Sequence, residues 1–401
     1  MSFIRRASGR SLLTFLGTVV AALVVIATAA SFALGGGGSP PPAKPLANAL
    51  HDAAAAPDVQ GVSAHVDFTN HLFDSLTMPE GSQPLLKGGS GRLWATDGKL
   101  RVELQGDTGD VQIVIANGSG FVYDGGGSNT VYRFTLPQQG DSRSGDRGSP
   151  AGHGVPAIAQ IQKRIDKASK NATIDGPQPT TFANEPAYSV RITPKDSGGL
   201  IGAAELAWDA ARGVPLRIAV YARGASTPAL ELQVTDISFG PVPASTFHVQ
   251  PPAGAHVVDL TGSERGSGAA QPDHGTGTRT HPEKLPAWLN DPATLAGRAR
   301  SDAKPTGPGG AVVVYGKGLD AIVVLEHRAD NAKAAPKPAP TDNSGDPGTQ
   351  LTFPTVSIGG ANGTQLSTPL GSVVNFERDG ISYTVLGSQP ASVIETAARG
   401  L

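Results

Sequence analysis

Histidines, carboxylates and a glycine run are the residues of this chain that could carry out polar chemistry, but none has the spacing that such chemistry needs. The nine histidines are scattered, and no two stand four residues apart with a carboxylate partner. Gly125-Gly-Gly127 follows an expected strand without a helix after it, which indicates a hairpin loop rather than a phosphate cradle. Asp107 and Asp110 lie in expected turns, where aspartate bonds nearby backbone.

Sequence motifs of known catalytic sites are also missing. There is no Gly-x-Ser-x-Gly, no His-Glu-x-x-His, no phosphate-binding Gly-x-x-x-x-Gly-Lys-Ser/Thr and no Ser-x-x-Lys in a suitable context. The chain has no cysteine, which excludes disulfides, thiolate metal sites and cysteine nucleophiles. Its net charge of -2 provides no basic field for nucleic acid. We therefore expect a protein that is not an enzyme and has no catalytic residue, cofactor or metal, and no nucleic-acid partner.

What remains is apolar chemistry, carried by side chains that share one face of a sheet. Leu100, Val102 and Leu104 alternate with charged and polar residues, so they point to one side of a strand. A following strand and an amphipathic helix, with apolar residues three and four positions apart, supply matching faces. The candidate ligand-binding residues are Leu100, Val102, Leu104, Val111, Ile113, Ile115, Ile158, Ile161 and Ile165. The alternative is that these side chains form an ordinary filled core.

The elements that must position these residues are short strands separated by turn signals. From Gly88 to Leu136, five apolar runs are separated by turn dipeptides such as Asp97-Gly98 and Asn117-Gly118, a pattern typical of an antiparallel meander. We expect helices over 46–56 and 155–168, a strand over 62–68, and a second strand set within 188–239 with a bulge near Asp236. The predicted fold is mainly β (α+β), an open antiparallel half-barrel with covering helices.

The N-terminus predicts a membrane segment. Arg5, Arg6 and Arg10 precede an uncharged run from Ser11 to Leu34, long enough as a helix to cross a hydrocarbon core of roughly 30 Å. The arginines place the N-terminus in the cytoplasm and the bulk of the chain outside it. A cleaved signal peptide, giving a secreted protein, is the alternative.

Composition suggests further boundaries. Glycine and proline make up about a fifth of the 401 residues, which indicates linkers. We expect an anchor and spacer over 1–45, the half-barrel over 46–260, a linker over 261–309, with Thr261 to Thr280 its most polar part, and a small α+β domain over 310–401. Within 282–309 the sequence permits either a short helix near Pro292 to Ala299, capped by Asp291, or an extended segment. Asn331 to Gly348 is expected to be a disordered loop, and Pro390 to open a last helix over 391–399.

The order of these elements resembles the lipoprotein-carrier superfamily, which includes the outer-membrane lipoprotein carrier and a periplasmic sensor that regulates an anti-sigma factor. The similar pieces are Gly91-Arg92-Leu93-Trp94, residues 97–102, Trp208-Asp209 through Gly213-Val214-Pro215-Leu216, and 247–257. Residues 315–325 and 373–390 resemble the small C-terminal domain of that sensor. No single motif is specific; the order of the elements carries the resemblance.

The resemblance implies a membrane-anchored, extracytoplasmic binding protein that holds acyl chains of a lipid or lipoprotein in an apolar concavity, for transfer or sensing. The alternative that it implies is an envelope-stress regulatory protein, which acts through a protein partner such as an anti-sigma factor and contacts it with the C-terminal domain. The sequence leaves these alternatives open, together with the ligand's identity and the oligomeric state.

Overall fold

The computed structural model describes residues 38–74, 84–106, 109–125, 129–136, 155–195, 198–259, 285–306, 309–328 and 353–401. Several predictions lie outside this part of the chain: the membrane segment 11–34, the polar linker 261–280, the loop 331–348 and most of the glycine run 125–127. Among the described residues, no helix has the length and apolar character needed to cross a membrane.

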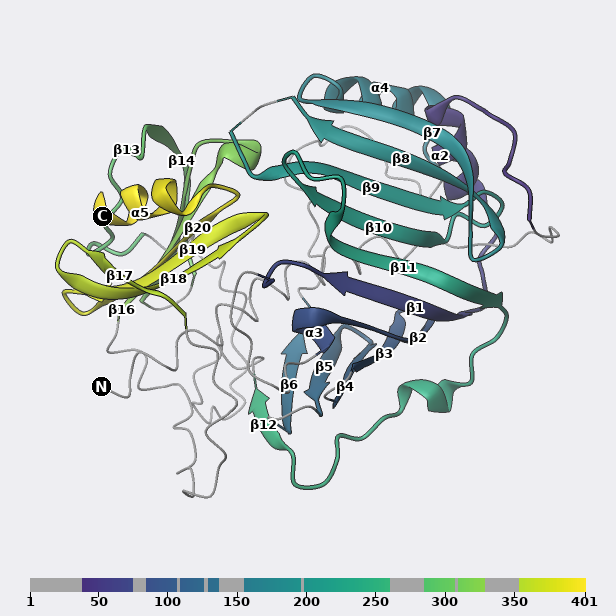
Figure 1. Ribbon diagram of the computed structural model, residues 1–401, viewed down its shortest axis with the longest axis horizontal. Helices are drawn as coiled ribbons and strands as arrows, with labels where there is room; N and C mark the ends of the chain where they lie inside the picture. Colours follow the sequence, from purple (N-terminus) through teal and green to yellow (C-terminus); the bar gives the residue numbers. More distant parts are fainter. Residues whose placement is uncertain are drawn as a thin grey trace, which may run out of the picture. The chain divides into compact units, whose positions relative to one another are not determined.

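The chain forms two compact units. The larger one holds the described residues from 38 to 195 and from 202 to 259, and the smaller one holds those from 285 onward. Residues 198–201, which lie between two strands of the larger unit in sequence, belong to the smaller unit by their contacts. Each unit is built on one sheet, and the two sheets can be followed by colour in Figure 1.

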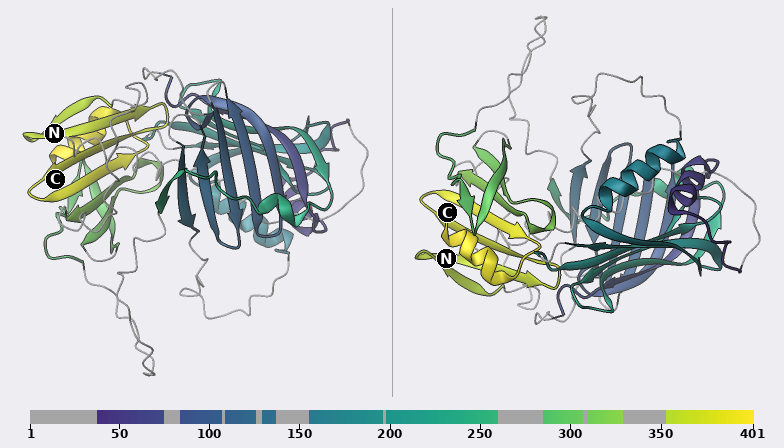
Figure 2. Two further views of the ribbon diagram at one scale, coloured as in Figure 1. Left: turned by 90° about the horizontal axis from the view of Figure 1, so that it is seen from below. Right: turned by 90° about the horizontal axis from the view of Figure 1, so that it is seen from above.

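The larger unit is a twelve-stranded sheet in the order β12-β6-β5-β4-β3-β2-β1-β11-β10-β9-β8-β7. Its strands are β1 (Val62–Asn70), β2 (Gly88–Thr96), β3 (Lys99–Gly106), β4 (Gly109–Ala116), β5 (Ser119–Asp124), β6 (Thr130–Thr135), β7 (Ala172–Phe182), β8 (Glu185–Pro194), β9 (Ile201–Asp209), β10 (Pro215–Ala222), β11 (Pro228–Phe239) and β12 (His256–Asp259). The sheet curls into a half-barrel, as expected (Figure 2).

Turn chemistry explains why the meander forms. Asn117 and Gly118 both have positive φ angles, as the two-residue turn between β4 and β5 requires, and Gly98 does the same between β2 and β3. Ala183 and Asn184 form a similar turn between β7 and β8. The dipeptides that the sequence marks as turns therefore lie between paired antiparallel strands.

The first strand lies in the middle of this sheet, because β1 pairs with β2 on one side and with β11 on the other. The register along β11 shifts between the pairs His65–Asp236 and Val66–Val234. The extra residue is Thr235, so the bulge predicted near Asp236 is confirmed. Because of this bulge, the apolar side chains of β11 before and after Thr235 lie on the same face of the sheet.

Among the described residues, four short helices accompany the sheet: α2 (Leu46–Ala55), α3 (Pro84–Lys87), α4 (Ile158–Ala168) and the 3₁₀ helix η2 (Ala244–Phe247). The helix predicted over 46–56 is confirmed, and it ends before Pro57, which cannot continue it. The second predicted helix begins at Ile158 rather than Val155, after the Pro156-Ala157 pair. The sheet curls toward the side that carries α2 and α4 (Figure 2).

The smaller unit is an eight-stranded sheet in the order β13-β14-β15-β16-β20-β19-β18-β17, accompanied by the helix α5 (Ala391–Arg399). Its strands are β13 (Thr294–Leu295), β14 (Arg298–Pro305), β15 (Gly310–Tyr315), β16 (Ile322–Arg328), β17 (Thr355–Ile358), β18 (Ala361–Thr368), β19 (Gly371–Arg378) and β20 (Ile381–Gly387). Inward side chains of the sheet pack against Ile394 and Ala397 of α5 in a fully buried core.

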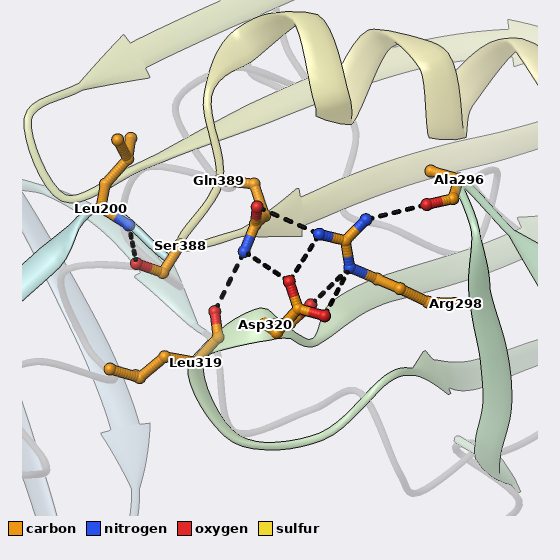
Figure 3. Close-up of polar contacts among 7 residues, drawn as sticks. All are labelled: Leu200, Ala296, Arg298, Leu319, Asp320, Ser388 and Gln389. Atoms are coloured by element: carbon orange, nitrogen blue, oxygen red, sulfur yellow. Dashed lines mark hydrogen bonds and ion pairs between the residues drawn. The ribbon is translucent and has the colours of Figure 1, made fainter. Parts of the chain in front are cut away.

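A polar network fixes the loop before α5 in the smaller unit. The Arg298 guanidinium donates to both carboxylate oxygens of Asp320, at 2.6 and 3.1 Å, and to the Ala296 carbonyl. It also donates to the side-chain oxygen of Gln389, whose amide donates to the Leu319 carbonyl (Figure 3). The main-chain N–H of Leu200 donates to Ser388 in the same loop.

Of the two alternatives for residues 292–299, the extended one is confirmed. β13 and the start of β14 are joined by a turn at Ala296 and Gly297, and Asp291 pairs with Arg300. Phe247 is the last residue of the 3₁₀ helix η2. The sheet of the larger unit is antiparallel except at its edge, where β12 pairs in parallel with β6.

Candidate functional site

The strand register of the larger unit arranges side chains in rows that run across the sheet. Within the β3–β4 pair, Leu100 stands opposite Ile115, Val102 opposite Ile113, and Leu104 opposite Val111. All six predicted strand residues therefore share one face, as the alternation in each strand predicts. We call this side of the sheet the apolar face.

The apolar rows extend well beyond β3 and β4. The row through Val102 and Ile113 begins at Ala64 and Leu93 and continues to Val122 and Tyr132. A further row joins Phe68 of β1 with Leu232 of β11 and Ile218 of β10. These additional residues were missed as site candidates, although the alternation in their own strands was visible, because the sequence does not give the order of the strands.

The side chains of the apolar face are not equally covered. Leu104, Val111, Ile113 and Ile115 are buried, and Val102 is 8% exposed. Several neighbours in the same rows are only half-buried: Phe68, Leu93, Leu100, Val122, Ile218, Val220 and Leu232. In the core of the smaller unit, by contrast, inward residues such as Val313, Val324 and Val385 are fully buried. Side chains of the described residues thus cover the apolar face incompletely.

Helices cover parts of this face. Ala49 of α2 packs with Tyr188, Val190 and Trp208 at the β8–β9 end of the sheet, and the Tyr188 hydroxyl donates to the Pro42 carbonyl at 2.6 Å. Near β1 to β4, the short helix α3 is fixed by Asn70, whose side-chain amide donates to the Leu85 carbonyl at 2.7 Å. Asn70 follows Val66 and Phe68 on the same face of β1, so α3 lies on the apolar side.

The predicted helix stripe is only partly buried. Ile161 is buried, Ile165 is half-buried, and Ile158 remains 40% exposed. Helix α4 contacts α2, and the carbonyl of Pro156 just before α4 lies 3.0 Å from the His51 ring. That the three isoleucines face a ligand over β3 and β4 stays a prediction.

The opposite face is polar but not wholly solvated. Arg217 pairs with Glu205 and Glu231, both at 2.5 Å, across neighbouring strands. Near β3 and β4, however, η2 covers the sheet: Arg101 donates to the Thr246 carbonyl at 2.8 Å, and Phe247 is buried. This cover explains why Val114, which points away from the apolar face, is buried as well.

Among the described residues, no three or more His, Cys, Asp or Glu side chains lie close enough together to hold a metal ion. Tyr132, at the β6 end of the apolar rows, has its pKa raised by burial and by the nearby Asp124 carboxylate, so its hydroxyl remains protonated at neutral pH. The chemical property of the apolar face is that it can bury the hydrocarbon surface of a ligand away from water.

Comparisons with known proteins gave matches among solved structures. No family model and no curated protein matches the chain. It is similar to MucB in the crystal structure of MucB in complex with MucA(peri), at 16% identity over 88% of this chain and 95% of that chain, with a TM-score of 0.37. The complex structure of Pseudomonas aeruginosa MucA/MucB gives 18% identity, the same coverages and a TM-score of 0.38.

Two further similar structures each match about half of this chain. A LolA superfamily protein from Nitrosomonas europaea is 11% identical over 50% of this chain and 96% of that chain, with a TM-score of 0.19. A putative outer membrane lipoprotein-sorting protein domain from Vibrio parahaemolyticus is 11% identical over 47% of this chain and 89% of that chain, with a TM-score of 0.14. Both kinds of protein that the sequence resembles are thus found among the structures similar to this chain.

Proposed function

We propose that this chain is a membrane-anchored, extracytoplasmic binding protein that holds acyl chains of a lipid or lipoprotein against the apolar face of its twelve-stranded sheet, for transfer or sensing. The observation that carries the proposal is that half-buried side chains occur in three rows of this face. Phe68, Leu232 and Ile218 share one row, Leu93 lies in the row of Val102, and Leu100 lies in the row of Ile115. Its anchor would be residues 11–34.

Energetics make an acyl chain a suitable occupant. Burying one CH₂ group is worth about 0.8 kcal/mol, so a chain with ~12 buried carbons gains on the order of 10 kcal/mol before the costs of association. The row of Val102 is apolar from β1 to β5 and ends at Tyr132 on β6, while the neighbouring row of Val111 ends at the buried Asp124. An extended hydrocarbon chain would match a row of side chains that crosses several strands.

An ordinary core is the competing interpretation of the same face. In a filled core, large apolar side chains reach near-complete burial, as they do in the smaller unit. The half-buried Leu100 and Leu232 do not reach this limit. The larger unit therefore still has apolar surface that a ligand could cover.

The test measures copurified lipid and binding of a fluorescent C16 fatty acid. The protein begins at residue 38, so that Pro42 and Lys44 keep their bonds to Tyr188 and Asp52. Organic extracts are analysed by mass spectrometry, and the variants are Leu100→Glu and Val102→Glu. Gln105→Glu is the control, since Gln105 is exposed on the opposite face of the same strand.

Each outcome decides between the two interpretations. A ligand site predicts that Leu100→Glu stays folded, because its carboxylate remains hydrated in an open concavity, and that it loses lipid and probe, whereas Gln105→Glu keeps both. A filled core predicts that both apolar-face variants unfold, since a buried unpaired carboxylate costs several kcal/mol. A folded Leu100→Glu that still retains lipid contradicts the proposed face.

A second candidate function is regulation through a protein partner, such as an anti-sigma factor. The observation that favours it is the smaller unit, which has its own complete core and contributes none of the apolar rows. A protein that only carries lipid has no evident use for it. Replacing exposed side chains of the smaller unit should then leave fatty-acid binding unchanged while it abolishes capture of a purified anti-sigma periplasmic domain.

A further inference from the structure

A carboxylic acid lies in the apolar core of the smaller unit. Glu326 on β16 alternates with Ile322 and Val324, and all three are fully buried. Across the sheet it stands opposite Ala311 of β15 and Tyr383 of β20. The strand pattern thus places an ionisable group at a position where its neighbours along the strand are apolar.

Glu326 has few polar partners. Its Oε2 accepts the main-chain N–H of Asn290 at 3.0 Å. Its Oε1 has no hydrogen-bond partner in the described part of the chain, and the same holds for the buried hydroxyl of Tyr315 on the neighbouring strand. Two polar atoms on the same side of the sheet are therefore buried without partners.

Charged groups around the site do not neutralise an ionised Glu326. Only burial and the Asn290 N–H act on its pKa, and burial, the larger effect, raises it to about 7. Burial and the Glu326 charge also raise the pKa values of Tyr315 and Tyr383, so both phenols stay neutral. The remaining titratable side chains near the cluster are Arg300 with its partner Asp291, Arg378 and Asp379 beside Tyr383, and His327 next on β16.

Asn290 connects this acid to the end of the chain. Its backbone N–H bonds Glu326, and its side-chain amide donates to the Leu401 carbonyl. Leu289 and Leu401 both pack against the core. The segment before Asn290 is only half-buried or exposed, so water can reach an ionised Glu326 most easily from this side.

We propose that Glu326 makes the smaller unit a pH-sensitive device: as a neutral acid it keeps the segment around Asn290 and the chain end docked on the sheet, and its ionisation loosens them. A protonated carboxyl group can both donate and accept hydrogen bonds. A carboxylate can only accept them, and its negative charge must be stabilised by a positive group or by water. The device is separate from the apolar face and does not depend on its ligand.

The sign of the effect follows from proton linkage. Glutamate in the unfolded chain releases its proton near pH 4.5, whereas folded Glu326 keeps it until about pH 7. The folded state binds more protons between these values, so the contribution of Glu326 to its stability is fully present below pH 4.5 and is lost as the pH rises to about 7. Above pH 7 both states are ionised and the loss is complete.

Hydrogen exchange of the full-length protein tests the device locally. Wild type and Glu326→Gln are compared at pH 5.0 and again at pH 8.0, so that intrinsic exchange rates cancel at each pH. Glutamine has nearly the same shape and carries no charge. The measured quantity is the ratio of the exchange rate in wild type to that in Glu326→Gln, for peptides from β15, β16, β20 and residues 285–290. This ratio should be on the order of 50-fold larger at pH 8.0 than at pH 5.0.

Controls distinguish this result from a general change in stability. Glu377→Gln removes an exposed carboxylate from the same sheet and should exchange like wild type at both pH values. Peptides of the larger unit should not change in either variant. If Glu326→Gln destabilises the unit by its own packing, Glu326→Met must still abolish the pH dependence. An equal difference at pH 5.0 and 8.0, or a pH dependence that persists in both variants, overturns the proposal.

Discussion

Gly91 on β2 lies so close to Glu103 on β3 that a Cβ atom on Gly91 would overlap the main-chain oxygen of Glu103. Gly91 belongs to the apolar row of Val66 and Leu104. Gly120 is similar, since its Cβ would lie 2.5 Å from the Val114 carbonyl oxygen. Residues on the inner side of a curved sheet are crowded, and glycine relieves that crowding at defined positions.

Replacing Gly91 by alanine should therefore destabilise the larger unit strongly. We expect Gly91→Ala to lower its free energy of unfolding by ~3 kcal/mol or more, because backbone rather than a flexible side chain must move. Urea unfolding followed by circular dichroism measures the change. Gly240→Ala is the matched control, since a Cβ there meets no atom within 4 Å. Equal stability of the two variants would show that the curvature does not depend on Gly91.

Arg298 should be irreplaceable by lysine. Its guanidinium bonds Asp320, Ala296 and Gln389 at once, in a planar arrangement that an ammonium group cannot reproduce. We expect Arg298→Lys to lower the stability of the smaller unit by about 2 to 4 kcal/mol, because Asp320 and the buried Gln389 lose partners. Thermal unfolding measures it, with Lys304→Ala on the same strand as an exposed control. An Arg298→Lys variant as stable as wild type contradicts this role.

Helix α4 allows packing and ligand contact to be separated. Ile161 is buried, so Ile161→Ala should cost about 2 kcal/mol of stability. Ile158 is 40% exposed, so Ile158→Ala should change stability by less than about 0.5 kcal/mol. If the helix stripe faces a bound acyl chain, Ile158→Ala should nevertheless weaken fluorescent fatty-acid binding several-fold. Unchanged binding would remove Ile158 from the site.

The proposed anchor predicts where the protein is found in the cell. The full-length chain should remain in the membrane fraction after washing with high salt and alkali, because residues 11–34 are uncharged and long enough to span the bilayer. N-terminal sequencing of the purified protein should begin at the first residues of the chain. A sequence that starts between residues 30 and 40 would instead identify a cleaved signal peptide and a secreted protein.

Local patterns predicted most of the elements, because alternation and turn residues act over a few positions. Asn117-Gly118 and Leu100 to Leu104 needed no knowledge of the rest of the chain. β7 was not predicted, because Pro177 and Pro179 interrupt its pattern. The sheet tolerates these prolines because β7 is an edge strand, where a residue without a main-chain N–H can face away from the neighbouring strand. β18 was missed as well, because Gly363 and its polar residues give no apolar alternation.

Long-range relationships could not be predicted from the sequence. The apolar face was predicted on β3 and β4, but its continuation through Phe68 and Leu232 depends on β1 pairing with β11. The cover that η2 gives to Val114 comes from a segment more than 100 residues away. Glu326 could not be recognised as buried from the sequence, because alternation alone does not distinguish a buried glutamate from an exposed one.

The central position of β1 also governs the order in which the sheet can be assembled. As the chain is synthesised, β1 can pair with β2 at once, and strands β3 to β6 can then add as neighbouring hairpins. The other edge of β1 has to wait for β11, whose residues are made roughly 160 positions later. Until then an open, apolar strand edge is available to any other extended chain. Folding should accordingly be slow, and a binding factor that shields nascent strand edges would have its greatest effect before residue 230 has emerged.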